Sequence, residues 1–329
     1  MIKKIIKRIP FAKKIKEVIC FRKEYNADRI FFKHNYSHSA ETKAKIGYNI
    51  LLIVHSLEKA MTNKHPRRFG VAKIEELAKL IDRYAGYGDY ELDFPFICAV
   101  NILREYANFY EMNDWGGADE CLMAKKVISK YKSVEIIIIG SFKLRKKEFE
   151  KDARIDYKKF LSSRHSIREF ARRKIGAKDL KTAIEAAILS PSACNRQMCK
   201  VYNVSNESKR KKLIEMAQGF GGFEKETINT LVITFDVNSN YFIGERNQGW
   251  LNAGLFSMNL VNALHSIGIG SCFCQFGNST RQEKTIKRIL GIPDNERIAV
   301  ILACGYYPEE CNVTHSPRKK PEDVLKNVI

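Results

Sequence analysis

Four short stretches of this sequence carry residue types that can hold an anion or read the edge of a polar ring. The first, RHSIREF, alternates Arg164, Ser166 and Arg168, so an extended backbone would point these side chains the same way. Guanidinium groups make bidentate, charge-assisted bonds to phosphate oxygens. The stretch therefore predicts a phosphate receptor, with a solvated basic surface as the ordinary alternative for a lone RxSxR pattern.

The second stretch, SPSACNRQ, brings Asn195 and Gln197, whose amides each offer a donor and an acceptor and can read the edge of a heterocycle. An isolated loop asparagine is more often a turn residue. The third, GIGSC at 268–272, follows a long apolar helix, and its glycines would let backbone N–H groups approach a flat ligand or would simply cap that helix. The fourth, SPRKKPEDV at 316–324, is again basic.

The elements that must position these stretches alternate between helices and short β-rich runs from about residue 155 onward. Strands are predicted at 200–205, 229–237 and 298–307, and they are too scattered for a regular βαβ series. The helix predicted at 250–266 is apolar on nearly every face, so we expect it to be buried on most sides. This half of the chain is therefore an α+β domain.

Residues 24–150 predict a mostly helical domain whose role the sequence does not reveal. One helix follows Ser39 as its N-cap, apolar stripes run along 74–85 and 96–110, and a weaker helix lies near 118–131. The apolar run VEIIIIG at 134–140 cannot be assigned from its pattern. A charged stretch at 143–159 marks the boundary with the α+β domain.

Residues 1–23 form a basic arm with nine Lys/Arg and one acidic residue. Ile2, Ile5, Ile6 and Ile9 recur at helical spacing before Pro10 interrupts it. A basic amphipathic helix can lie on an anionic membrane, which would add a peripheral contact with its inner face. The alternative is an arm that packs on the body of the protein or on a partner chain.

The bulk composition narrows the class of protein further. The 329 residues are enough for two domains, and the net charge of +20 is spread without zinc-finger spacing or an RNA-binding motif, so no nucleic-acid partner is predicted. The nine cysteines include no CxxC pair, which favours free thiols in a reducing cytosol. The sequence contains no apolar run of about 18 residues, so we predict no membrane-spanning helix. A cytoplasmic location is expected.

The order of these stretches resembles the nitroreductase family of FMN-dependent oxidoreductases. That family runs from R-x-S-x-[RK]-x-F through [SA]-P-S-x-x-N-x-Q and a long core helix into G-[LI]-G-[ST]-C, a G-Y-P turn and a basic tail. The corresponding stretches here are RHSIREF, SPSACNRQ, GIGSC, GYYP at 305–308 and RKKP at 318–321. The resemblance covers residues 155–329 and implies an α+β, nitroreductase-like FMN-binding fold, a dimer with a mixed or antiparallel sheet flanked by helices, preceded by the helical domain.

The resemblance also implies roles around the FMN phosphate and the reducible end of the flavin. Arg164 and Arg318 would hold the phosphate, and Ser166 would support the phosphate or the ribityl chain. Arg168 would lie near N1 and the C2 carbonyl of the flavin, where a cation stabilises the negative charge that builds on reduction.

The ring itself would be bounded by the other two stretches. Asn195 and Gln197 would face its polar edge, while backbone groups of the GIGSC stretch would approach N5 and O4. The full implied cofactor set is Arg164, His165, Ser166, Arg168, Pro191, Ser192, Asn195, Gln197, Gly270, Ser271, Cys272 and Arg318. In that family the flavin lies at a homodimer interface and the Pro-Ser-x-x-Asn loop comes from the partner chain. The helix at 250–266 would then be the dimer helix.

Two departures from the family pattern affect this site. Met198 and Cys199 stand where the family has a proline and an aromatic residue, so the lining beside the flavin differs. The basic tail could place Lys319 or Lys320 where the resemblance puts Arg318.

The implied activity is ping-pong hydride transfer from NAD(P)H through flavin N5 to an electron-poor acceptor, nitro or quinone-like. The flavin supplies the chemistry, so no protein catalytic residue and no metal are predicted. One alternative is a flavin-dependent dehydrogenase of a peptide- or sugar-linked substrate. Another is a non-catalytic flavin-binding interaction protein at the membrane.

The N-terminal half carries a second resemblance. YNADRIFF, VHSLEKAM and RRFG are similar to stretches of a nitroreductase-like subgroup associated with bacterial polysaccharide synthesis, which has glycines where Ala60 and Arg68 stand here. His55 and Glu58, one helical turn apart, could share a metal or a proton. A packed or exposed helix pair is the competing explanation, because no third ligand is evident.

Overall fold

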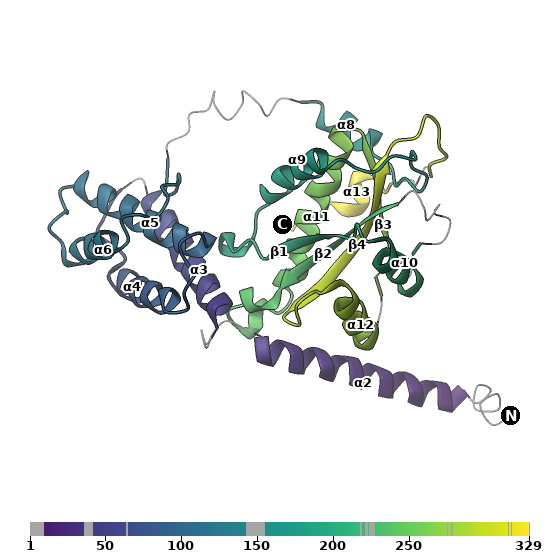
Figure 1. The fold of residues 1–329 in the computed structure, drawn as a ribbon, viewed down its shortest axis with the longest axis horizontal. Helices are drawn as coiled ribbons and strands as arrows, with labels where there is room; N and C mark the ends of the chain where they lie inside the picture. Colours follow the sequence, from purple (N-terminus) through teal and green to yellow (C-terminus); the bar gives the residue numbers. More distant parts are fainter. Residues whose placement is uncertain are drawn as a thin grey trace.

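The computed structural model describes most of the chain. The described residues are 10–35, 42–63, 65–142, 155–217, 219–220, 223, 228–274, 276–277, 279–314, 316 and 318–328. The first nine residues of the predicted arm, Ser39 and positions 143–154 of the charged boundary lie outside them. Figure 1 shows a helical half and an α+β half, with one long helix, α2, running beneath the latter.

The helical half is a bundle of α3 (Lys43–Met61), α4 (Val71–Ala85), α5 (Phe94–Glu111) and α6 (Asp119–Lys130). Its core uses the predicted stripes, since Ile74, Leu77, Phe96 and Leu103 are all fully buried. The predicted N-cap Ser39 is wrong, because α3 begins after Thr42, whose hydroxyl accepts a hydrogen bond from the Lys45 N–H at 3.3 Å. Thr42 is nearer the helix and equally able to cap it.

The unassigned run at 134–140 is an extended segment without a partner strand among the described residues. Asn101 of α5 holds its backbone, donating to the Glu135 carbonyl at 2.8 Å and accepting from the Ile137 N–H at 3.3 Å. Ile137 and Ile139 pack against the helical core. Ile138 is fully exposed. The alternation is that of a strand, but a side-chain amide takes the place of a neighbouring strand.

The α+β half contains a four-stranded antiparallel sheet in the order β1-β2-β4-β3. The strands are β1 (Cys199–Asn203), β2 (Asn229–Asp236), β3 (Ile269–Cys274) and β4 (Glu296–Tyr306). β1, β2 and β4 confirm the three predicted strands. β3 is an element that sequence analysis missed, because a short edge strand with the composition IGSCFC lacks the β-branched alternation that identifies a strand.

Helices cover both faces of this sheet (Figure 1), which confirms the predicted architecture. The helices are α9 (Ala177–Ile188) and α11 (Gln248–Ser266) on one face, and α10 (Glu207–Met216) and α12 (Thr280–Leu290) on the other. In β2, Leu231 and Ile233 face α9 and α11, whereas Val232 faces α10 and α12. Burial on both faces explains the nearly continuous apolar runs of the central strands.

α11 is buried on one side only within a single chain. Ala253, Leu260 and Leu264 pack on the sheet. The opposite side leaves three large apolar residues exposed, namely Leu251, Leu255 and Met258, whereas the partly exposed Trp250 packs its ring against Phe235 of β2. The expectation that this helix is buried on most sides is therefore wrong for the isolated chain.

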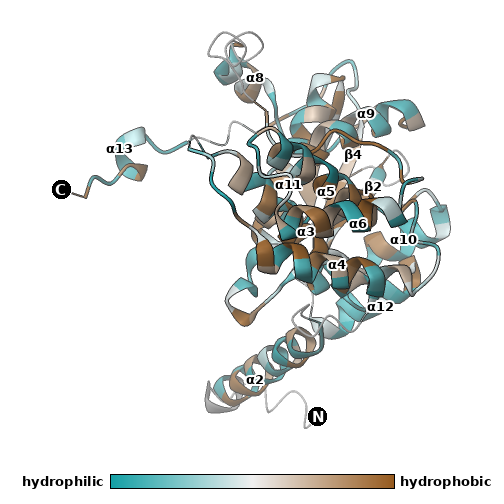
Figure 2. Ribbon diagram, turned by 90° about the vertical axis from the view of Figure 1, so that its left-hand side faces the viewer, coloured by the Kyte–Doolittle hydropathy of each residue, from teal (hydrophilic) through white to brown (hydrophobic). Residues whose placement is uncertain are grey.

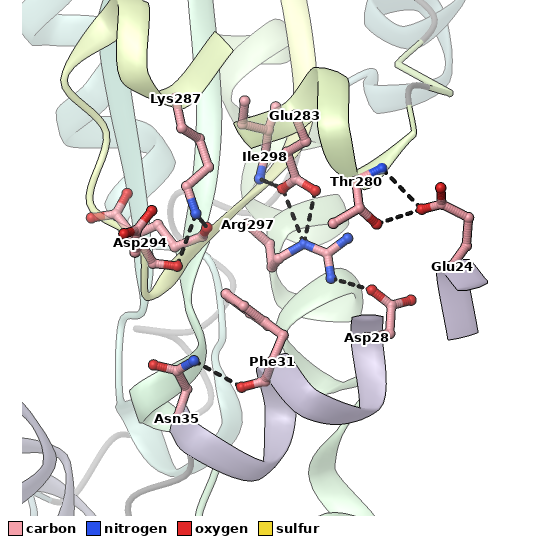
Figure 3. Close-up of polar contacts among 11 residues, drawn as sticks. Glu24, Asp28, Phe31, Asn35, Thr280, Glu283, Lys287, Asp294, Arg297 and Ile298 are labelled. Atoms are coloured by element: carbon pink, nitrogen blue, oxygen red, sulfur yellow. Dashed lines mark hydrogen bonds and ion pairs between the residues drawn. The ribbon is translucent and has the colours of Figure 1, made fainter. Parts of the chain in front are cut away.

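α2 (Pro10–Asn35) runs through the predicted boundary at residue 23 as one helix. Pro10 begins it, a position where a missing N–H costs little. Its C-terminal half is fastened to the α+β half (Figure 3): Glu24 accepts a hydrogen bond from the Thr280 N–H at 2.9 Å, and Asp28 pairs with Arg297 at 2.7 Å. Arg297 also binds Glu283 of α12 at 3.0 Å. One buried guanidinium thus joins α2, α12 and β4.

Replacing this guanidinium should destabilise the protein. Arg297→Gln leaves the Glu283 carboxylate, 7% exposed, without its ion-pair partner, so we expect the free energy of unfolding in urea to fall by about 3 kcal/mol or more. Arg288→Gln, an exposed change on α12, the helix that carries Glu283, is the control. Its free energy of unfolding should stay within about 0.5 kcal/mol of wild type. Equal stability of the two variants would contradict the account.

Candidate functional site

The RHSIREF stretch lies along the edge strand β3. It follows α8 (Tyr157–Ser163), and the backbone at Arg164 is extended, with φ −81° and ψ 120°. Ser166 forms a parallel bridge with Ser271, and the Ile167 N–H donates to the Ser271 carbonyl at 3.0 Å. The first and third chemistry-bearing stretches, a hundred residues apart in the sequence, are therefore neighbours.

Two glycines allow this contact. A Cβ built on Gly270 would lie 2.9 Å from Cγ1 of Ile167, and one on Gly305 would lie 2.7 Å from Cβ of Phe170. Both approaches are closer than real side chains permit, so only glycine fits. Gly270 of the GIGSC stretch thus has a packing role that sequence analysis did not foresee, in addition to any role in approaching a ligand.

Positive charge converges on the same edge. Burial raises the pKa of the Cys272 thiol, while the charges of Arg168 and Arg164 and a hydrogen bond with Ser166 oppose the rise. Burial also lowers the pKa of His265, and the charges of Arg164 and His165 add to that shift. Arg164, Ser166 and Arg168 therefore lie near Cys272 of β3.

Arg164 has a donor available for a ligand. Its Nε is buried, and it has no hydrogen-bond partner among the described residues. A buried donor without a partner costs free energy that a bound anion would recover. The cationic cluster and this donor together fit a phosphate group.

His265 organises the surroundings of Arg164. Its Nδ1 lies 2.7 Å from the Tyr307 hydroxyl and its Nε2 lies 2.8 Å from the Ser163 hydroxyl. The ring thereby connects α11 to the end of α8 and to the turn after β4. Sequence analysis missed this residue; a polar side chain at the end of an otherwise apolar helix is the signal that could have identified it.

The second stretch forms a strained loop before β1. Cys194, Asn195 and Gln197 have φ values of 50°, 51° and 47°, which side-chain-bearing residues rarely adopt. The Ser192 hydroxyl accepts a hydrogen bond from the Gln197 N–H at 3.0 Å. Asn195 and Gln197 are both exposed, so their amides are available to a ligand. A pocket of about 190 Å³ lies beside Gln197 and is also lined by Pro191, Ser192, Asn252 and Phe256, among others.

A buried arginine holds this loop in place. Arg196, 2% exposed, binds both carboxylate oxygens of Glu245 at 2.8 Å and donates from Nε to the Ala193 carbonyl at 2.9 Å. It also donates to the Ser239 carbonyl. Sequence analysis missed Arg196 and Glu245, since an arginine between two polar loop residues looks solvated when the loop's fold is unknown.

The two halves of the predicted site do not meet within one chain. The loop at 191–197 leads into β1, RHSIREF lies along β3, and these strands are the two edges of the sheet. Arg318 is not brought to either half: it is exposed in the C-terminal tail, where it donates to the Ser316 carbonyl. The tail ends in α13 (Pro321–Val324), which lies away from the body of the protein in Figure 2.

Other features of the described residues bear on the remaining expectations. The nine cysteines are all free thiols. Among the described residues, no three His, Cys, Asp or Glu side chains cluster as metal ligands would. His55 and Glu58 do pair, with Nδ1 3.3 Å from Oε2. Of the helices that the structure describes, none has both the length and the apolar character to cross a bilayer.

Comparison with known proteins finds similarity over the α+β half. Residues 161–230 and 230–306 match the family described as "Nitroreductase family". A protein of Archaeoglobus fulgidus named as an NADH dehydrogenase/NAD(P)H nitroreductase is 27% identical over 153 residues, covering 46% of this chain and 86% of that protein. The NADPH-flavin oxidoreductase of Vibrio harveyi is 23% identical over 165 residues, covering 47% of this chain and 65% of the relative.

A solved structure is similar to this chain over about half of its length. The nitroreductase family protein of Streptococcus pneumoniae TIGR4 is 24% identical, and the similarity covers 53% of this chain and all of that protein, with a TM-score of 0.45. The helical bundle α3–α6 and the helix α2 lie outside the residues that match the family.

The Arg196–Glu245 pair yields a pH-dependent prediction. Burial raises the pKa of Glu245, but hydrogen bonds from Arg196 and the Tyr241 N–H outweigh it and leave the pKa below its usual value. A carboxylate whose pKa is depressed in the folded state stabilises the protein above its unfolded pKa, and this contribution disappears as the pH falls through the folded value. Arg196→Met should therefore lower the free energy of unfolding by about 3 kcal/mol at pH 7.

The difference between wild type and Arg196→Met should shrink as the solution is acidified below about pH 4. Urea unfolding across a pH series measures it. Lys211→Met breaks an exposed pair with Glu207 and should change stability by less than about 0.5 kcal/mol at every pH. If the difference in free energy of unfolding between wild type and Arg196→Met stays constant down to acidic pH, the loss of the Arg196–Glu245 ion pair is not the cause of that difference.

Proposed function

We propose that this protein is an FMN-dependent oxidoreductase that takes hydride from NAD(P)H and passes it to an electron-poor acceptor. The observation that carries the proposal is the docking of RHSIREF on β3. It gathers Arg164, Ser166 and Arg168 and leaves the buried Nε of Arg164 without a hydrogen-bond partner among the residues that the structure describes. The nitroreductase family match over this region supports it. The relative from Vibrio harveyi is named as an NADPH-flavin oxidoreductase, which supports a flavin as the cofactor.

FMN would supply the reversible hydride chemistry, and the residues of this chain would bind it and tune it. Arg164 would hold the phosphate through charge-assisted bonds, with Ser166 beside it. Arg168, exposed on the same edge, would place its charge near the reducible end of the ring and favour the state that carries more electrons. Arg318, Lys319 or Lys320 of the tail would add a phosphate contact.

The proposed site is completed by a second copy of the chain. Within one chain the Asn195 loop and the Arg164 cluster occupy opposite edges of the sheet, so one flavin touching both would need the loop of a partner. The apolar row on α11, formed by Leu251, Leu255 and Met258, offers a surface for such a homodimer. Dimerisation would remove this row from water.

The cofactor assignment is tested by the purified protein and two variants. We expect about one FMN per chain, and bleaching of its absorbance on mixing with NADPH or NADH. Arg164→Gln should weaken FMN binding by tenfold or more, the equivalent of roughly 1.5–3 kcal/mol for a charged hydrogen bond. Arg168→Gln should lower the reduction potential of the bound flavin.

Arg281→Gln, an exposed change on α12, is the control. It should alter neither the affinity for FMN nor the reduction potential of the bound flavin. Recovery of FAD, or failure of the protein to bind added FMN, would refute the assignment of FMN as the cofactor. A flavin that binds but stays oxidised with both nicotinamides would favour a non-catalytic flavin-binding protein. Slow bleaching by the nicotinamides combined with rapid reoxidation by oxygen would favour a dehydrogenase of another substrate.

We also propose a peripheral membrane contact through α2. Ile15, Val18, Ile19 and Phe21 are exposed along its N-terminal half among many basic residues. Full-length protein should co-sediment with anionic vesicles, be released by high salt, and bind neutral vesicles poorly. Ile19→Ser with Phe21→Ser should reduce the binding, and unchanged binding would argue that net charge alone is responsible. The association with polysaccharide synthesis rests on resemblance of the helical half and assigns no chemistry.

A further inference from the structure

His265 lies at the end of α11, between two elements that border Arg164. Its Nε2 is 2.8 Å from the Ser163 hydroxyl at the end of α8, and its Nδ1 is 2.7 Å from the Tyr307 hydroxyl in the turn after β4. The Phe160 ring of α8 packs beside it, with the ring centroids 5.1 Å apart. Both ring nitrogens already bind hydroxyl groups, so the imidazole can act on a ligand only through these neighbours.

The hydrogen bonds around the ring assign its tautomer. A serine hydroxyl has one hydrogen, and Ser163 donates it to the Phe160 carbonyl at 2.8 Å. Ser163 therefore accepts from His265, and Nε2 carries the ring hydrogen. In a neutral imidazole the other nitrogen is an acceptor, so the Tyr307 hydroxyl donates to Nδ1. The hydrogen of this hydroxyl is occupied as long as the ring is neutral.

Protonation of the ring reverses the bond with Tyr307. An imidazolium donates from both nitrogens, so Nδ1 would donate to the Tyr307 oxygen and the hydroxyl hydrogen would turn toward another acceptor. Tyr307 lies at the cationic edge: a Cβ built on Gly270 would be 3.1 Å from its Cε1, and the charge of Arg164 opposes the rise that burial gives to the Tyr307 pKa. The released donor would therefore join the buried Arg164 Nε, which has no hydrogen-bond partner among the described residues.

The charge of the ring depends on the groups that face it. These are Arg164 and His165, from the segment after α8, and Tyr307, from the turn after β4. Burial lowers the pKa of His265, and the charges of Arg164 and His165 add to that shift, so the free ring is neutral near pH 7. A phosphate monoester carries a charge of about −1.5 to −2 at this pH. Its arrival beside Arg164 would offset the positive charge and favour the imidazolium.

We propose that His265 is a positioning residue for a phosphate monoester bound beside Arg164. The ring takes up one proton from solvent at Nδ1 as the phosphate binds, and the released Tyr307 hydroxyl donates to a phosphate oxygen. That this phosphate belongs to FMN rests on the proposed function, whereas the proton uptake does not. His265 would thereby favour FMN over riboflavin, which has no phosphate.

Proton uptake is measured by calorimetric titration of flavin-free, full-length protein with FMN at about pH 7.5, in two buffers with different enthalpies of protonation. Wild type should take up a measurable fraction of a proton, and its affinity for FMN should rise as the pH falls from about 8.5 to about 7. The phosphate of FMN, with a pKa of about 6, is already mostly dianionic there and does not account for the uptake. His265→Gln can still bind both hydroxyls but cannot titrate, so FMN should bind without proton uptake.

A second variant separates the phosphate contact from a merely structural role. Tyr307→Phe keeps the ring and removes the donor, so it should weaken FMN binding about tenfold, as expected for the loss of a hydrogen bond to a charged group. Its affinity for riboflavin should stay within about twofold of wild type. Tyr25→Phe, an exposed change on α2, is the control and should alter neither affinity by more than about twofold.

The outcomes distinguish this inference from the proposed function. FMN binding without proton uptake would overturn the inference while the flavin assignment stands. Uptake that survives in His265→Gln would do the same, as would equal losses of FMN and riboflavin affinity in Tyr307→Phe. A protein that binds no FMN, yet takes up a proton through His265 when inorganic phosphate is added, would overturn the proposed function and leave the phosphate site standing. Neither FMN binding nor uptake with phosphate would overturn both.

Discussion

The contact between Ile167 and Gly270 is the constraint on which the proposed site depends. It brings the chain segment with two arginines against an edge strand that would otherwise be exposed, with no room for a side chain at the crossing. The bridge between Ser166 and Ser271 then fixes the register, so that Ile167 points into the core and its neighbours point outward. A one-residue slip would bury the polar Ser166 or the charged Arg168 instead of Ile167, and the cost of burying either keeps the register unique.

The sheet order extends this constraint to the whole molecule. Because β1 and β3 are the two edges, the residues that could grip a phosphate and those that could read a ring edge are separated by the width of the sheet. The Asn195 loop is nevertheless built rigidly, with three residues at positive φ held over the buried Arg196–Glu245 pair. A loop strained in this way and left exposed is typical of a recognition surface. In the proposed dimer its ligand would lie in another copy of the chain.

The sequence alone was sufficient for much of this picture and insufficient where a contact depends on the third dimension. The three apolar strands, the helical stripes and the alternation of Arg164, Ser166 and Arg168 follow from local periodicity, and the structure confirms the arrangement of the elements. β3 was missed because its glycine, serine and cysteines satisfy packing rather than strand propensity. Arg196 was missed because nothing local distinguishes a buried arginine from a solvated one, and His265 was missed although its place at the end of an apolar helix was a usable signal. The continuity of α2 across residue 23 escaped for a similar reason: Pro10 starts the helix, and the Arg297 contacts that fasten it come from the far end of the chain.

The central claim is that one flavin site is shared between two copies of the chain, and mixed dimers test it most directly. Arg164→Gln and Asn195→Ala chains carrying different affinity tags are co-expressed, and the doubly tagged dimer is isolated. If the site combines Arg164 of one chain with Asn195 of the other, the mixed dimer has one intact site, and half of its FMN should bind with wild-type affinity. If both residues serve a site within the same chain, every site in the mixed dimer carries one substitution, and no FMN would bind with wild-type affinity.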